Sequence, residues 1–279
     1  MKTILIVATL MTCALAASAA EVAPSADGSF TSRNFTMPVS TAMAFPAKSI
    51  LDKTDVIVVA ISNGDFRTDW FATFFDRRRA IERRMKDKDT AVVYLEFKPD
   101  GAYRGLSYYF AQGNGCGYCG GSLGVTSTVK LANGRIAGSL KSKDESRTFD
   151  VVFNVPVTPD DHGAPLPPDG GAPGKAYMGY HAALVKRDVK ALRPFVSNEM
   201  REYLERAEKK GKVAAEMNFM AKEHPDKSVQ ITKGFSKGNH AVLLIAGETS
   251  VMKLTGEVVL VNEGGTWRVD DQLTDVVMQ

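Results

Sequence analysis

Hydrophobic residues along the chain follow two patterns, separated by one stretch that has neither. Residues 34–155 are dominated by short apolar runs bounded by turn residues, which is typical of β-strands. Residues 175–279 begin with segments of helical periodicity and end with further strand-like runs. Between them lie residues 156–174, PVTPDDHGAPLPPDGGAPG, whose proline and glycine content predicts a linker. The pattern therefore predicts an α+β protein with two domains.

The first predicted domain is a mostly antiparallel sheet with one helix. The β-branched run Val56–Ile61 predicts a buried strand, and Asn133-Gly134 marks a β-hairpin because this dipeptide favours the tight turn. The helix is expected over Thr68–Lys86, where apolar residues recur on one face. The same segment carries five arginines, Arg77, Arg78, Arg79, Arg83 and Arg84. They admit two interpretations, a patch for phosphate or membrane headgroups and the solvated face of an amphipathic helix; the acidic residues among them favour the second.

The N-terminus has the composition of a secretory signal peptide. Residues 1–20 begin with one early charge, continue with an apolar run and end in small residues. This pattern predicts cleavage near Ala19 or Ala20, a periplasmic or secreted protein, and a mobile lead-in over residues 21–33. No other stretch of the sequence reaches the roughly 20 apolar residues that a spanning helix requires, so no membrane insertion is expected after cleavage.

Charge and motifs exclude several classes of function. The formal net charge is +3 at pH 7, which gives no reason to expect nucleic acid as a partner. The sequence has no phosphate-binding glycine loop, no zinc-protease or serine-hydrolase motif and no calcium-loop pattern. We therefore expect no cofactor.

Cys116 and Cys119 are the two cysteines that remain after cleavage, and an even number in an oxidising compartment predicts a disulfide. The tetrapeptide Cys-Gly-Tyr-Cys that they enclose is identical to the active-site segment of periplasmic disulfide isomerases of the thioredoxin superfamily. That resemblance implies a redox-active pair, but the glycines that follow oppose the helix on which such a site depends. A structural disulfide in a short loop is the favoured interpretation. A zinc site would need two further ligands, and no histidine lies at ligand spacing, so no metal is expected.

The C-terminal domain carries signals in its first helix and in its last strands. The opening helix contains Ala182–Leu184, Asp188 and Leu192, and the chain closes on Gly256–Asp270, GEVVLVNEGGTWRVD. Together these residues resemble the nuclear-transport-factor-2-like superfamily, particularly its small exported bacterial members. The resemblance implies a cystatin-like cone, in which a curved antiparallel sheet wraps helices around a cavity. It also implies a homodimer through the open face of the sheet as one candidate assembly.

Four residues are candidates for the lining of such a cavity: Tyr177, His181, Trp267 and Asp270. Enzymes of the superfamily place an acid–base pair there. A lone histidine on a partly apolar helix face is more often a core residue, however, and no catalytic pair is assigned. The main hypothesis is an exported protein that binds a small ligand or a periplasmic protein without catalysis. Two alternatives stay open, thiol–disulfide exchange at the cysteine pair and an isomerase or hydrolase that uses His181 with an aspartate.

Overall fold

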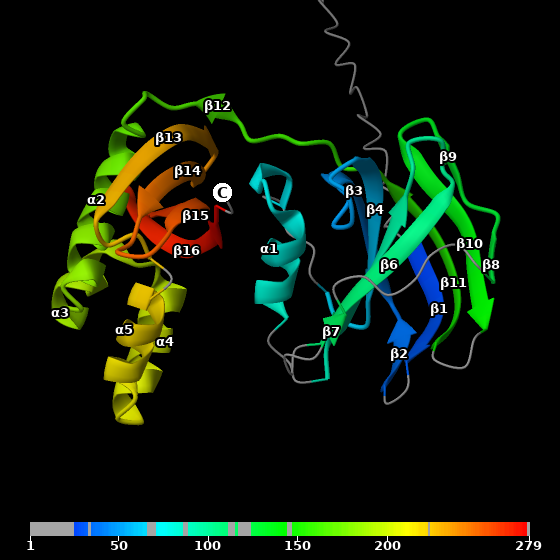
Figure 1. The fold of residues 1–279 in the computed structure, drawn as a ribbon, viewed down its shortest axis with the longest axis horizontal. Coiled ribbons are helices and arrows are strands. Elements are labelled where there is room, and N and C mark those ends of the chain that lie inside the picture. The colour runs from blue at the N-terminus through cyan, green and yellow to red at the C-terminus, as the bar shows by residue number, and fades with distance from the viewer. Residues whose placement is uncertain are drawn as a thin grey trace, which may run out of the picture.

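The computed structural model describes residues 25–32, 35–65, 71–85, 89–110, 115–116, 124–143, 147–222 and 224–277. These residues form an α+β protein, as predicted, with three antiparallel sheets. The helices are η1 (Phe71–Thr73), α1 (Arg77–Arg84), α2 (Gly171–Val185), α3 (Val189–Leu192), η2 (Arg193–Phe195), α4 (Asn198–Lys209) and α5 (Val213–Lys222). Sheets and helices stack as successive layers along the long axis of the molecule (Figure 1).

The N-terminal unit is a sandwich of two sheets rather than the single sheet that was predicted. The first sheet, ordered β2-β1-β11-β10-β8 with β9 beside β10, contains β1 (Ser25–Ser32), β2 (Phe35–Val39), β8 (Val125–Ser127), β9 (Lys130–Ala132), β10 (Arg135–Lys143) and β11 (Arg147–Pro156). The second sheet, ordered β3 to β7, contains β3 (Thr41–Lys48), β4 (Asp55–Ser62), β5 (Ala91–Phe97), β6 (Tyr103–Phe110) and β7 (Gly115–Cys116). Apolar side chains of both sheets form one shared core.

The second sheet is covered on both of its faces. Val93 and Leu95 of β5 belong to the core of the sandwich, whereas Val92 and Tyr94 pack with Ile81 of α1 on the opposite face. Because strand side chains point alternately to the two faces, every residue of β5 is buried. This double burial explains why every residue of the strand except Glu96 is apolar or aromatic.

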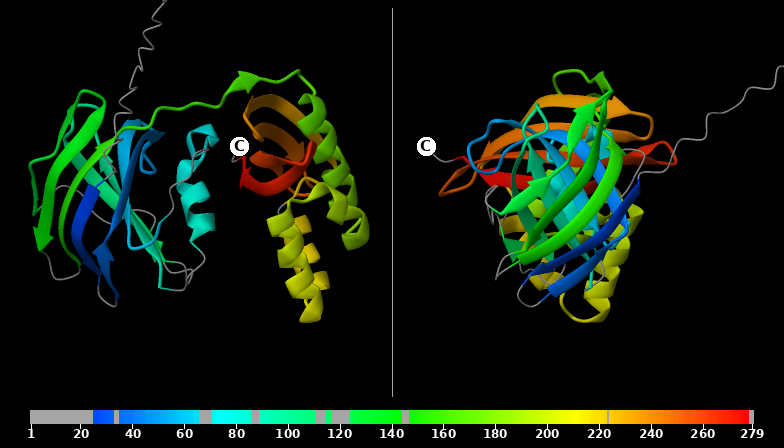
Figure 2. Two further views of the ribbon diagram at one scale, coloured as in Figure 1. Left: turned by 180° about the vertical axis from the view of Figure 1, so that it is seen from behind. Right: turned by 90° about the vertical axis from the view of Figure 1, so that its right-hand side faces the viewer.

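The C-terminal unit is a five-stranded sheet with most of the helices on one face. Its order is β12-β13-β14-β15-β16, from β12 (Ala164–Pro165), β13 (Ser228–Lys237), β14 (His240–Glu248), β15 (Lys253–Glu263) and β16 (Thr266–Val276). Tyr177 and Leu184 of α2 pack against Val258 of β15 on this face. The other face of the sheet is turned toward α1, which lies between the two units (Figures 1 and 2). No helix in the described part of the chain is both long and apolar enough to span a bilayer.

Residues 21–33 were predicted to be a mobile lead-in, but Ser25–Ser32 within this range form β1. The strand pairs with β11 along its whole length, and Phe30 is fully buried in the sandwich core. Backbone pairing with a long neighbour supplies the hydrogen bonds, so the strand forms although few of its residues are apolar. Residues 1–24, which include the predicted signal peptide and its cleavage site, lie outside the described residues.

The predicted linker at residues 156–174 is also more regular than its composition suggests. Ala164–Pro165 pair with β13, and the last residues of the range begin α2. Pro173 fits because the first N–H groups of a helix need no intrahelical acceptor. A Cβ at position 174 would lie 1.9 Å from the carbonyl oxygen of Asp169, so Gly174 permits the close approach of the chain there.

Candidate functional site

Three consecutive arginines at the start of α1 reach three different parts of the molecule. Arg77 lies across the chain that leaves β11. Its guanidinium donates to the carbonyl oxygens of Thr158 and Pro159, each at 2.7 Å, and lies 2.9 Å from a carboxylate oxygen of Asp160. The Arg77 side chain is 2% exposed, so the expectation of a solvated face is wrong for this residue, while the side chains of Arg83 and Arg84 lie outside the described part of the structure. Burial lowers the pKa of Arg77, and the charge of Asp160 opposes that shift.

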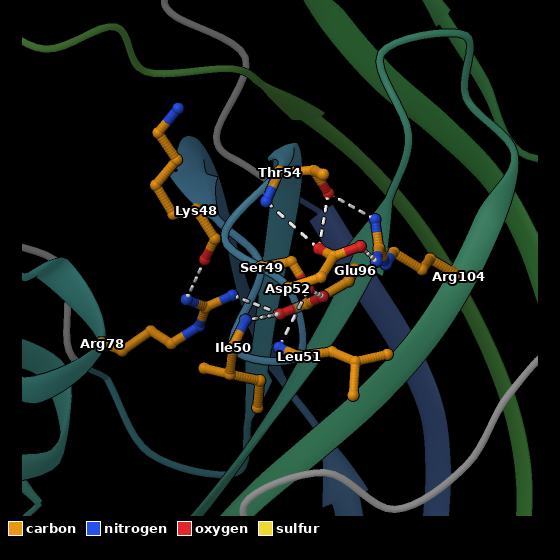
Figure 3. Close-up of polar contacts among 9 residues, drawn as sticks. All are labelled: Lys48, Ser49, Ile50, Leu51, Asp52, Thr54, Arg78, Glu96 and Arg104. Carbon is orange, nitrogen blue, oxygen red and sulfur yellow. Dashed lines mark hydrogen bonds and ion pairs between the residues drawn. The ribbon is translucent and has the colours of Figure 1, made fainter.

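Arg78 holds the turn that follows β3. It donates to the carbonyl oxygen of Lys48 at 2.8 Å and to the carboxylate of Glu96 at 2.7 Å (Figure 3). Glu96 is fully buried and also accepts from Ser49 Oγ at 2.7 Å and from the Ile50 N–H at 3.3 Å. One buried carboxylate therefore ties the turn, α1 and β5 together.

The same turn is braced from its other side. Arg104 of β6 donates to Asp52 and to Thr54 Oγ1, and Asp52 accepts from the N–H and the hydroxyl of Thr54 (Figure 3). These hydrogen bonds, that from Arg104 first, lower the pKa of Asp52 to about 2. Residues 49–54 between β3 and β4, here called the braced turn, are therefore a rigid element. Leu51 lies at its exposed tip.

Arg79 and Glu257 join α1 to the C-terminal sheet. Arg79 donates to Asp275 of β16 at 2.7 Å. In return, the two carboxylate oxygens of Glu257 accept the backbone N–H groups of Phe75 and Asp76, each at 3.0 Å. Helix α1 begins immediately afterwards, with Asp76 as its N-cap. This contact explains why the helix is shorter than predicted, since the preceding N–H groups are satisfied from outside the helix.

Glu257 is a carboxyl group almost without access to solvent, at 5% exposure. It lies on β15 between Leu244 and Leu273 of the neighbouring strands, facing α1. Burial raises its pKa to about 7, against the opposing effect of the two backbone hydrogen bonds; the charges of Asp76 and Asp271 add to the rise. The group therefore titrates near neutrality while it links the two units.

A cleft of about 660 Å³ opens beside these contacts. Its walls are β3 with the braced turn, α1 with the residues before it, and strands β13 to β16. Apolar side chains from both units line it, among them Phe45, Ile50, Leu244 and Leu273. The cleft is large enough for a drug-sized organic molecule. Sequence reasoning missed it, because its lining comes from segments far apart in the chain.

The four candidates predicted from the sequence lie elsewhere in the C-terminal unit, and none is among the described residues that line this cleft. Tyr177 is fully buried between α2 and the sheet, and its hydroxyl has no hydrogen-bond partner among the described residues. Trp267 packs at the edge of the same core, and Asp270 is the extra residue of a bulge in β16. No hydrogen bond or ring contact joins Trp267 or Asp270 to His181 in the described part of the chain.

His181 pairs with a second histidine rather than with an aspartate. Its Nδ1 lies 2.6 Å from Nε2 of His224, whose Nδ1 lies 2.7 Å from the amide nitrogen of Gln272. Burial lowers the pKa of His181, and burial together with the charge of His181 lowers that of His224 to about 3. The two rings are thus held neutral, with one proton between the facing nitrogens. A pocket next to Gln272 encloses only about 90 Å³.

The cysteine pair is described only in part. Cys116 belongs to β7 and lies opposite Tyr108 of β6, whereas Cys119 lies outside the described residues. The predicted disulfide is therefore still a prediction. Among the described residues, no group of three or more histidine, cysteine or acidic side chains is placed to hold a metal ion.

No model of a protein family matches this chain, and no curated protein matches it significantly.

Proposed function

We propose that this protein is an exported, non-enzymatic binding protein that holds a small organic ligand in the cleft between α1 and the C-terminal sheet. The observation that carries the proposal is the cleft of about 660 Å³, to which both units contribute. Sites for small molecules are typically concave, mostly apolar and formed in advance of binding. The braced turn and the three anchored arginines provide that rigidity, because each is fixed by contacts to a different layer.

The C-terminal unit is, in this proposal, a nuclear-transport-factor-2-like cone whose interior is no longer the binding site. Its helices followed by an antiparallel meander agree with that assignment. The space that a cone would offer to a ligand holds the side chains of Tyr177, Leu184 and Leu260, each no more than 1% exposed. Binding would therefore use the outer face of the sheet and not its interior.

The catalytic alternative has less support than binding. The expected partner of His181, an aspartate, is replaced by His224 and the amide of Gln272. A carboxylate beside a histidine would raise its basicity, whereas a neutral imidazole does not. Burial in addition lowers the pKa values of both histidines. The buried acid Glu257 is held by two backbone N–H groups, so its role is explained by the contact between the units.

The proposal is tested by filling the cleft. Thr255 is an exposed residue of β15 in the wall of the cleft, so Thr255→Trp should occupy the space at little cost to folding. Thr266→Trp, at an exposed position of β16 outside the described lining, is the matched control. The probe is 8-anilinonaphthalene-1-sulfonate, titrated by fluorescence against the folded protein. Binding should be lost in Thr255→Trp and kept in the control, whereas equal binding by both variants would refute the assignment of the site.

A further inference from the structure

The charged side chains around the cleft are almost all committed to partners within the protein. The three arginines of α1 are anchored as described, and Lys48 lies 2.6 Å from Asp55. The acids are committed as well: Asp76 accepts from the Arg79 N–H, Glu257 accepts from two backbone N–H groups, and Asp275 accepts from the Arg79 guanidinium. The charge of each of these groups is therefore already balanced, at least in part, within the protein.

Lys53 is the exception. It lines the cleft, its side chain is exposed, and among the described residues its ammonium group has no hydrogen bond or ion pair. Its position is nevertheless fixed, because it belongs to the braced turn and its N–H donates to the carbonyl oxygen of Ser49 at 3.0 Å. Its φ of 62° is a left-handed conformation that a lysine rarely adopts without support from its surroundings. The turn thus presents an exposed lysine side chain at the rim of the cleft, next to its apolar wall.

The wall beyond Lys53 has the opposite character. Ile50 extends from the same turn, and Phe45 and Pro46 follow along β3. Leu244 and Leu273 face them from the C-terminal sheet. These side chains offer dispersion contacts and no hydrogen bonds, so they favour a hydrocarbon or aromatic body.

We infer that the cleft takes an amphipathic organic anion, with one carboxylate or similar group at Lys53 and an apolar body between β3 and the C-terminal sheet. This inference rests on the proposed function and specifies the chemistry of its ligand. A cationic ligand is disfavoured because Asp76, Glu257 and Asp275 already accept hydrogen bonds within the protein. Burial also raises the pKa of Glu257 to about 7, which reduces the negative charge that this group carries near neutrality.

The experiment uses three probes of equal chain length: decanoate, 1-decanol and decyltrimethylammonium, each titrated into the folded protein by calorimetry. Decanoate should bind most tightly of the three, and its affinity should fall as salt is added. Lys53→Gln should lower the affinity for decanoate roughly tenfold, because it removes one charge-assisted hydrogen bond. The affinity for decanol should not change. Lys98→Gln, at an exposed position after β5 outside the described lining, is the matched control and should behave as the wild type.

Each outcome bears on one of the two proposals. Equal binding of all three probes, abolished by Thr255→Trp, would leave the cleft as a binding site and overturn the assignment to anions. An unchanged affinity of Lys53→Gln for decanoate would overturn it as well. Failure of every probe to respond to Thr255→Trp would instead refute the proposed function itself.

Discussion

Replacement of Glu257 is expected to change how the stability of the protein depends on pH. In the folded protein the pKa of this carboxyl is about 7, raised by burial from an ordinary value of 4.5. When α1 leaves the sheet, or the chain unfolds, the group returns to water and to its ordinary pKa. The folded state therefore holds the proton more tightly, and it is favoured by acid.

The size of the effect follows from the two pKa values. A difference of about 2.5 pKa units corresponds to about 3 kcal/mol. This contribution is fully present below about pH 4.5, declines as the pH rises, and is lost once the pH passes 7. His181 and His224 also affect the stability in this pH range. Their pKa values are lowered in the folded protein, so these histidines favour the folded state as the pH rises. The contribution of Glu257 must therefore be measured as a difference between variants.

The variant Glu257→Gln has an uncharged side chain at every pH, so it is the reference from which this difference is measured. The amide can accept one of the two N–H groups but opposes the other, so at pH 5 the variant should be less stable than the wild type by about 1 kcal/mol. Near pH 8.5 the order should reverse, because only the wild type then buries a charge. Urea unfolding followed by circular dichroism, repeated from pH 5 to 8.5, measures the difference in the free energy of unfolding. A difference that stays constant within about 0.5 kcal/mol would refute the reasoning.

A control separates this effect from a general loss of negative charge. Glu202 of α4 carries a side chain that is 71% exposed, so Glu202→Gln removes the same charge without a buried contact. The pH dependence of this control should match that of the wild type.

Three further predictions follow from individual contacts. Arg77→Ala should destabilise the fold by roughly 3 to 5 kcal/mol, because it leaves buried carbonyl groups and Asp160 without their cation, whereas Arg79→Ala should cost less than about 1 kcal/mol; urea unfolding compares the two. Tyr177→Phe removes a buried hydroxyl that has no partner among the described residues, so it should be neutral or stabilising by up to about 2 kcal/mol in the same assay, and a loss of stability would show that the hydroxyl is bonded. If Cys116 and Cys119 form a structural disulfide, alkylation after equilibration in redox buffers should give a potential below about −300 mV, and a value between roughly −120 and −230 mV would support thiol exchange instead.

The local parts of this fold could be predicted from the sequence because their causes are local. The Asn133-Gly134 turn has positive φ at both residues and joins β9 to β10, as the dipeptide indicates. Ser197 is likewise a residue type that favours the cap position of a helix, and at the start of α4 its hydroxyl accepts from the Met200 N–H at 3.2 Å. In both cases the deciding interaction lies within a few residues of the pattern.

The site could not be predicted because its partners are distant in the chain. In the sequence the arginines of α1 form a basic cluster typical of a solvated helix, and partners far along the chain, among them Thr158, Glu96 and Asp275, make them buried or bridging groups. One signal was available, since Glu257 directly precedes the apolar run Val258–Val261 in the middle of β15. A charge at such a position indicates a partner, but the sequence does not say which one.

Helix α1 occupies the face of the C-terminal sheet through which a homodimer was expected. Val259 on that face is fully buried beneath Phe74 and Ala80, so a second subunit could bind there only if α1 left. A tethered helix competes at an effective concentration in the millimolar range, about a hundredfold above a partner at 20 μM. We therefore expect a monomer by sedimentation at pH 5.5 and, despite the weaker hold of Glu257, at pH 8.5. A dimer that forms only at the higher pH and is abolished in Glu257→Gln would show that α1 can be displaced and that the carboxyl controls the exchange.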